Sequence, residues 1–260
     1  MSAVEKPSWF GGRELLALAV VALAAAPPLS TYIATQSWER VKARPVTRTI
    51  KVTGSAKKRI VSDLIEWSAT VSADAKDKLT AYRELHADAE ATVAYLKAQG
   101  VPDDQIFPDS ATVEEVTETV YEGKGDDRIS KQVLVGYRAH QAITVRSTDV
   151  QRIERLSREV TNLLEQDVQV QSNAAAYYYT KLGDLKIEML SAATRDARTR
   201  AEQMLKSAGG AGIGRLNVAD MGVINVNPAN STETSWEGNN DTSSLEKDII
   251  AIVHVTYDLK

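Results

Sequence analysis

Residues 64–100 read LIEWSATVSADAKDKLTAYRELHADAEATVAYLKAQG, and the spacing of their apolar side chains changes once along the stretch. Over residues 64–72 apolar and polar side chains alternate, which predicts a strand that turns Trp67 and its alternate neighbours to one face. Over residues 77–99 the apolar side chains recur every three or four positions, as on an amphipathic helix, and Gly100 suits the left-handed residue that ends one. A half-buried strand followed by a helix predicts an α+β domain.

The rest of the chain continues this mixture of strands and helices. A shorter helix is predicted at residues 149–165, and a second long helix with a stripe of alanines at residues 182–208. Residues 106–121 and 130–146 predict a long antiparallel hairpin. The remaining expectations are strands at residues 47–54, 168–179, 215–226 and 248–259, a polar turn at 55–59 and a polar, mobile loop at 227–244.

The two long helices end alike, with LKAQG at residues 96–100 and LKSAG at residues 205–209. Each is preceded by a predicted strand and followed by two more. This order suggests a β-α-β-β unit used twice and joined by the helix at residues 149–165, although similar glycine caps also arise independently. We therefore expect an antiparallel or mixed β-sheet with two long helices and one shorter helix.

Residues 15–37, near the N-terminus, contain no charged side chain. As a helix, residues 15–35 would span about 31 Å, close to the hydrocarbon thickness of a bilayer. The strongly apolar part, residues 15–26, has the length typical of a secretion signal, and two prolines at 27 and 28 interrupt a helix. We expect a transmembrane anchor, with a cleaved signal or an amphipathic or buried helix as the alternatives.

This segment divides the chain into a tail at residues 1–14, an anchor or signal at 15–37, a basic linker at 38–46 and a domain at 47–260. Arg40, Lys42 and Arg44 follow the segment, whereas the basic residues before it are offset by acidic ones. By the positive-inside rule alone, these charges would place the C-terminal domain in the cytoplasm.

Composition excludes several classes of function. The net charge is −4, which disfavours binding to a phosphate backbone, so no nucleic-acid partner is expected. The chain has no cysteine, so disulfides, thiolate metal sites and thiol nucleophiles are excluded. The three histidines are far apart in sequence and lack the spacing of metal ligands.

No catalytic, cofactor-binding or metal-binding residues emerge from the motifs. The glycine-rich stretch at residues 209–214 follows a helix and opens a strand, the reverse of a phosphate-binding loop. No serine lies in a Gly-x-Ser-x-Gly elbow. The sequence therefore predicts a protein that is not an enzyme, while a hydrolase whose triad is assembled only in space stays open.

Tyrosine and tryptophan supply the candidate interface residues. Tyr177, Tyr178 and Tyr179 are consecutive, and in a strand two of the rings would share a face. Such residues are favoured at interfaces, but cross-strand packing would also explain them. Trp236 lies in the polar loop at residues 227–244, where it either makes external contacts or folds back onto the domain.

Several short sequence motifs occur in order along the predicted domain. They are IKVTG at residues 50–54, LKAQGVPDD at 96–104, GYRA at 136–139, YYYTKLGDLKIEML at 177–190 and the terminal strand of alternating isoleucine and valine. In this order the set resembles the SIMPL-domain family of bacterial envelope proteins, a domain of unknown function, over about residues 47–260.

The resemblance implies a domain exported to the periplasm or cell exterior, an association with oxidative or envelope stress and a tendency to self-assemble. It offers no catalytic residues. We expect a homo-oligomeric protein held in the inner membrane by residues 15–37, single-pass, with its domain in the periplasm, or released there if the segment is cleaved. No small-molecule substrate is expected. The alternative is a module that binds a small ligand or envelope polymer through residues 177–179 and 227–244.

Overall fold

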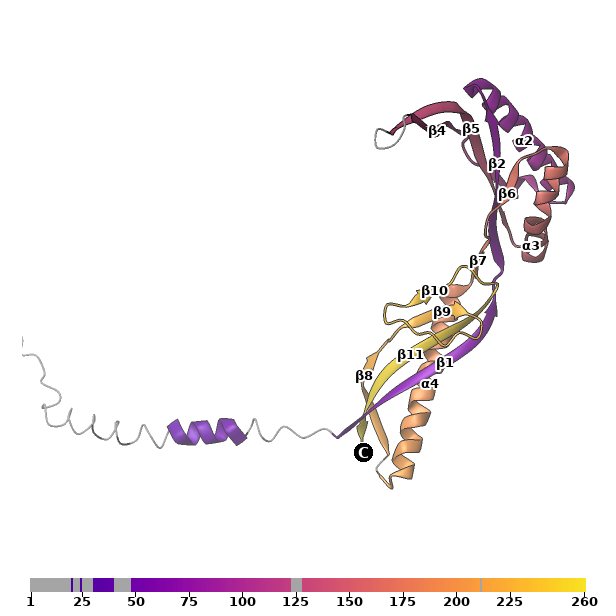
Figure 1. Ribbon diagram of the computed structural model, residues 1–260. Helices are drawn as coiled ribbons and strands as arrows, with labels where there is room; N and C mark the ends of the chain where they lie inside the picture. The colour runs from indigo at the N-terminus through magenta and orange to yellow at the C-terminus, as the bar shows by residue number, and fades with distance from the viewer. Residues whose placement is uncertain (1–19, 21–23, 25–29, 40–47, 123–127, 211) are drawn as a thin grey trace, which may run out of the picture. The chain divides into compact units, whose positions relative to one another are not determined.

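The computed structural model describes residues 20, 24, 30–39, 48–122, 128–210 and 212–260 (Figure 1). The chain divides into two units, Met1–Thr49 and Ile50–Lys260. In the first unit residues 30–39 are helical. Most of the predicted anchor at 15–37 and of the linker at 38–46 lies outside the described residues. Within the described part of the chain, no helix combines the length and the apolar character needed to cross a bilayer.

The second unit is α+β, as predicted, and contains two sheets, each with its own core. In the first sheet the strand order is β3-β5-β2-β6, with β4 also paired to β5 and β7 to β2. Helices α2 (Lys78–Ala98) and α3 (Val150–Glu159) pack against it. Its strands are β2 (Leu64–Ala75), β3 (Ile106–Pro108), β4 (Thr112–Glu122), β5 (Ile129–Ser147), β6 (Val170–Ser172) and β7 (Ala176–Tyr178).

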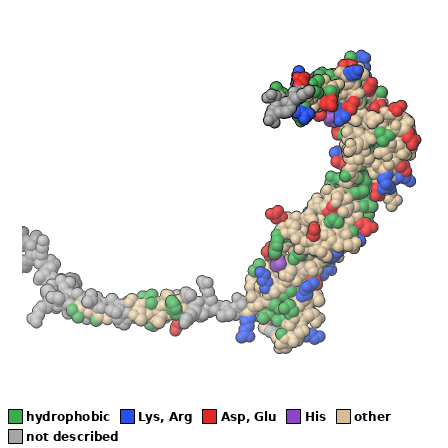
Figure 2. All heavy atoms as spheres, in the orientation of Figure 1, with side chains coloured by type: hydrophobic (Ala, Val, Ile, Leu, Met, Phe, Trp, Pro, Cys, Tyr) green, Lys and Arg blue, Asp and Glu red, His purple; other side chains and the backbone are tan. Residues whose placement is uncertain are grey.

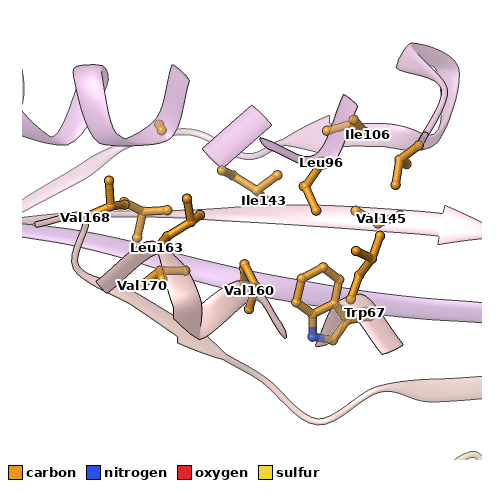
Figure 3. Packing of buried hydrophobic residues seen from close by; sticks show 14 of the residues in the cluster. Trp67, Leu96, Ile106, Ile143, Val145, Val160, Leu163, Val168 and Val170 are labelled. Carbon is orange, nitrogen blue, oxygen red and sulfur yellow. The ribbon is translucent and has the colours of Figure 1, made fainter. Parts of the chain in front are cut away.

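The core of the first sheet is built from the alternation in β2. Ile65, Trp67 and Val71 are at most 1% exposed, which confirms the predicted inner face. Figure 3 shows Trp67 among apolar side chains of the sheet and of the segments that cover it. The Trp67 indole nitrogen donates a hydrogen bond to Ser172 Oγ at 3.0 Å, so the buried ring keeps a partner for its one polar atom.

The second sheet has the order β1-β11-β9-β10, with β8 also paired to β11. Helix α4 (Leu182–Ser207) covers it, and its alanines at positions 193, 197 and 201 are fully buried, as the small stripe predicted. A Cβ on Gly54 of β1 would collide with the backbone of α4, so the close approach needs glycine there. The strands are β1 (Thr49–Val61), β8 (Ile213–Asp220), β9 (Ile224–Pro228), β10 (Asn239–Asn240) and β11 (Glu246–Leu259).

The two sheets share a plan, but the second is not built from consecutive elements. In the first, β5 lies between β2 and the pair β3 and β4; in the second, β11 lies between β1 and the pair β8 and β9. The strand directly before α4 is β7, which pairs with β2 of the first sheet. The predicted β-α-β-β order therefore describes the elements of the first sheet. In the second sheet, the strand expected directly before the helix is replaced by β1, from the start of the domain.

Several predicted boundaries differ from the structure. Residues 55–59, predicted as a turn, continue β1, because ion pairs with β11 and α4 satisfy their charges. The predicted strand at 168–179 is two short strands, β6 and β7, and that at 215–226 divides into β8 and β9. The helix predicted at 149–165 becomes a 3-10 helix from Val160 to Gln166. Of the sheet pairings with a described register, only β9–β10 is parallel.

Candidate functional site

The three consecutive tyrosines lie where the chain passes from one core to the other. Tyr177 packs against the first core, and Tyr179 against the second. Tyr178 pairs with Leu64 of β2 and is 37% exposed. Strand β7 ends at Tyr178, so the strand alternation that would turn Tyr177 and Tyr179 to one face does not extend to Tyr179.

A buried lysine joins β11 to this crossing point. Lys247 is 2% exposed, and its Nζ donates hydrogen bonds to the carbonyl oxygens of Tyr177, at 2.7 Å, and of Asp241. Burial lowers the pKa of Lys247 below its ordinary value. Burial raises the pKa of Asp241, but hydrogen bonds from Ser243 and Ser244 and the charge of Lys247 together outweigh it and leave that pKa below its ordinary value. No pattern in the sequence predicts this contact, because Lys247 and Tyr177 lie far apart along the chain.

A buried carboxylate joins β1 to β11. Asp248 Oδ1 accepts from Arg59 Nε at 2.6 Å, and Oδ2 lies 2.9 Å from Lys57 Nζ and accepts from Asn230 N at 2.8 Å. The Asp248 side chain is 1% exposed. The hydrogen bonds from Arg59 hold the pKa of this carboxyl far below its usual range.

The polar loop at residues 227–244, predicted as mobile, is tied to β9 by two fully buried asparagines. Asn225 Oδ1 accepts from Ser235 N at 3.0 Å, and Asn227 Nδ2 donates to Glu233 O at 2.5 Å. Asn227 Oδ1 in turn accepts from Asn239 Nδ2 at 2.8 Å. The motifs considered above do not include these asparagines, and their alternation within INVNP at residues 224–228 is the signal in the sequence that points to them.

The anchored loop forms one wall of a pocket of about 450 Å³. The other walls are the turn between β8 and β9, at residues 220–223, and the side chains of Ile252 and His254 on β11. Trp236 lines the pocket and is 88% exposed, so it does not fold back onto the domain. The tyrosines at 177–179 do not line this pocket, so the structure separates the two groups of candidate interface residues.

The hairpin of β4 and β5 forms a second exposed surface. The pairing of β5 with β2 ends at Tyr137, and from Gly136 back to Ile129 β5 pairs with β4 alone (Figure 1). We call this part, residues 116–122 and 129–136, the hairpin arm. Its exposed apolar side chains, between 38% and 72% accessible, are Val120, Tyr121, Ile129, Val133, Leu134 and Val135.

Charge is divided between the strands of the hairpin. Strand β4 carries four glutamates, two of them on the arm, whereas β5 carries Lys131 on the arm and Arg138 and Arg146 beyond it, and Arg128 precedes it. The Arg128 guanidinium lies 4.8 Å from the centre of the Tyr121 ring. Over the rest of the face shown in Figure 2, acidic and basic side chains are interspersed, and neither charge forms a continuous field.

Comparison with known families matches this chain to SIMPL, described as a protein of unknown function (DUF541), over residues 50–257. The chain belongs to the SIMPL family. The match spans nearly all of the second structural unit, Ile50–Lys260, and confirms the resemblance seen in the sequence. No curated protein matches the chain. The family description assigns no activity, so the roles of residues in this SIMPL chain are argued from their geometry alone.

The histidines of the SIMPL domain bear on the hydrolase alternative. His254 Nδ1 lies 2.9 Å from Thr53 Oγ1, so one hydroxyl is within hydrogen-bond reach of a histidine. Among the residues that the structure describes, no carboxylate forms a hydrogen bond or ion pair with His254, and Thr53 does not line the pocket. His86 is exposed and lies 3.5 Å from Glu90. The contact at His254 thus provides two members of a triad without the group that would orient the base.

Among the residues that the structure describes, no three His, Cys, Asp or Glu side chains are grouped so that they could hold a metal ion.

Proposed function

We propose that this SIMPL protein is a non-catalytic component of the bacterial envelope that assembles with copies of itself through the hairpin arm. Residues 15–37 tether it to the inner membrane, and its domain lies in the periplasm, where the assembly protects or scaffolds the envelope under oxidative stress. The observation that carries the proposal is the set of exposed apolar side chains on the arm.

Exposed apolar side chains on a two-stranded arm favour association. Each large apolar side chain that becomes fully buried contributes about 1.5–3 kcal/mol. The arm is also a sheet edge, because among the described strands β4 pairs with β5 alone. An open edge pairs readily with another chain.

The charges on the arm favour a second copy of this chain as the partner. On and beside the arm, Glu118 and Glu122 of one copy complement Arg128 and Lys131 of another, whereas two copies of β4 side by side would bring these glutamates together. Because the contact joins β4 of one copy to β5 of the next, it is head-to-tail, and it closes into a ring where the rotation between copies allows.

The membrane placement is supported by the sequence and the family. Residues 15–37 are free of charge over a length that suits a bilayer. The resemblance to envelope proteins favours a periplasmic domain over the cytoplasmic one that the flanking charges alone would predict. A reporter fused after Lys260 tests this: activity of a periplasmic reporter supports the proposal, and activity of a cytoplasmic one overturns the placement.

Light scattering of the purified full chain across a range of concentrations tests the assembly. The wild-type protein is expected to show the mass of an oligomer, and the double variant Ile129→Asp/Leu134→Asp that of a monomer. Leu216→Asp is the matched control, because Leu216 is 53% exposed on β8 and Leu134 is 47% exposed on the arm. A wild-type protein that is monomeric throughout, or a double variant that still assembles, would overturn the proposed assembly.

A further inference from the structure

We propose that the pocket beside Trp236 binds a small organic cation, namely a substituted ammonium group carried on a ring or alkyl body. Its volume of about 450 Å³ falls in the range of small-molecule sites. The pocket contains no residue of the hairpin arm, so this inference does not depend on the proposed assembly.

The apolar part of the pocket comes from Met221, Val223 and Ile252. Trp236 stands at the same site with 88% of its surface exposed, and Met221 is 69% exposed. A large indole left in water beside an apolar wall offers a surface for a ring or an alkyl chain. Tryptophan is also the aromatic side chain whose face attracts cations most strongly.

The charges around the pocket determine the sign of the ligand. Asp220 is the one carboxylate among the lining residues, and no lysine or arginine lines the pocket. Among the described residues, none forms an ion pair or hydrogen bond with the Asp220 side chain, so its charge is available to a ligand. The loop that carries Trp236 adds Glu233 and Glu237 and contains no lysine or arginine, whereas Asp241 and Glu246 face Lys247 and Arg59. This local field attracts cations and repels anions.

The pocket walls are held in place before any ligand arrives. Ser235 is fixed by the buried Asn225, and the Ser235 hydroxyl accepts from Glu237 N at 3.3 Å, so the backbone on both sides of Trp236 is held. A Cβ on Gly222 would collide with Ile252 O, which shows how closely the β8–β9 turn lies against β11. A preformed site binds without the entropy cost of ordering a loop.

The test is a titration of the full chain with benzyltrimethylammonium, followed through the indole N–H signals in a nitrogen–proton NMR spectrum. The Trp236 signal, assigned with Trp236→Phe, is expected to shift and saturate, while that of the buried Trp67 stays in place. Benzyl alcohol and phenylacetate serve as the neutral and anionic counterparts of the probe. We expect weaker binding of the alcohol and weakest binding of phenylacetate.

Two variants and a control separate the contributions of Trp236 and Asp220 to binding of the cation. Trp236→Ala lacks the indole signal, so its binding is followed through the backbone amide signals of Gly222 and Val223 in the same spectrum, and its dissociation constant for the cation is expected to rise about 2- to 5-fold, the scale of a cation–π contact at an exposed site. Asp220→Asn is expected to raise it about 3-fold while leaving benzyl alcohol unchanged. Glu122→Gln, on the hairpin arm, is the control and should leave binding of the cation unchanged.

Three outcomes would overturn the proposal: no saturable shift at Trp236, equal binding of the three probes, or full binding by Asp220→Asn and Trp236→Ala. Circular dichroism of each variant establishes that it is folded. If Trp236→Ala does not fold, Asp220→Asn and the three probes still decide between a cation site and a merely apolar one.

Discussion

Replacing Asp248 with asparagine should destabilise the second sheet, because it removes a buried charge that ties β1 to β11. The carboxylate is 1% exposed and is contacted by Arg59, Lys57 and the backbone N–H of Asn230. Asparagine has nearly the same shape and still offers one oxygen to Asn230 N. The substitution therefore isolates the effect of the charge from the effect of packing.

The expected loss in the free energy of unfolding depends on how exposed the side chains that contact Asp248 are. Hydrogen bonds to a charged group contribute about 1.5–3 kcal/mol each, and ion pairs with exposed partners much less. Arg59 and Lys57 are 43% and 51% exposed, so solvent screens both. We expect Asp248→Asn to lower the free energy of unfolding by about 2 kcal/mol. For a domain of this size that is a fall in melting temperature of about 4–8 °C.

The effect should depend on pH in one direction. The pKa of Asp248 is lower in the folded protein than in the unfolded chain, so the unfolded chain takes up the proton first as the pH falls. The stability that Asp248 contributes is therefore complete above about pH 5 and is lost progressively as the pH falls toward the folded pKa. Asparagine does not titrate, so the difference between the two proteins should narrow over the same interval.

Thermal unfolding followed by circular dichroism, at pH 7 and at several values below pH 5, measures both effects. Glu188→Gln is the matched control, because it breaks the pair between Lys58 of β1 and Glu188 of α4, in which both side chains are exposed. The control should melt close to the wild type. Equal melting temperatures for wild type and Asp248→Asn at pH 7, or a difference that widens in acid, would refute the reasoning.

Two further substitutions test the packing of the second sheet and the crossing between the cores. Gly54→Ala should lower the free energy of unfolding in urea by about 3 kcal/mol, because its Cβ meets the backbone of α4, whereas Gly183→Ala, with nothing within 4 Å, should not destabilise. Lys247→Met should lower it by about 2–3 kcal/mol, because the carbonyl oxygens of Tyr177 and Asp241 lose their buried donor. A more stable Lys247→Met would mean that burying the ammonium costs more than its hydrogen bonds return.

The features that the sequence predicted well are local. The alternation of apolar and polar residues predicted the buried face around Trp67, and a spacing of four residues predicted the buried alanines of α4. Both patterns follow from the geometry of a single strand or helix, so they need no knowledge of the partner. The same is true of the long hairpin, whose two strands are neighbours in the sequence.

The features that were missed depend on distant partners. Residues 55–59 resemble a turn by composition, and the partners that hold them as a strand, among them β11 with Asp248 and α4 with Glu188, lie far along the chain. The hydrogen bond between Thr53 and His254 joins residues 201 positions apart. The pocket likewise needed the loop around Trp236 to be placed against β11, which the asparagines of β9 accomplish. No periodicity within a segment reports such contacts.

The pairing of β1 with β11 sets the order in which this chain can fold as it is made. Strand β1 starts at Thr49 and β11 ends at Leu259, so the second sheet cannot close until almost the whole chain has been synthesised. The first sheet with α2 and α3 needs only residues up to Tyr178 and can form earlier. Until β11 emerges, β1 is an unpaired edge exposed to other chains. A premature stop before Glu246 would therefore leave a folded first half carrying an aggregation-prone strand.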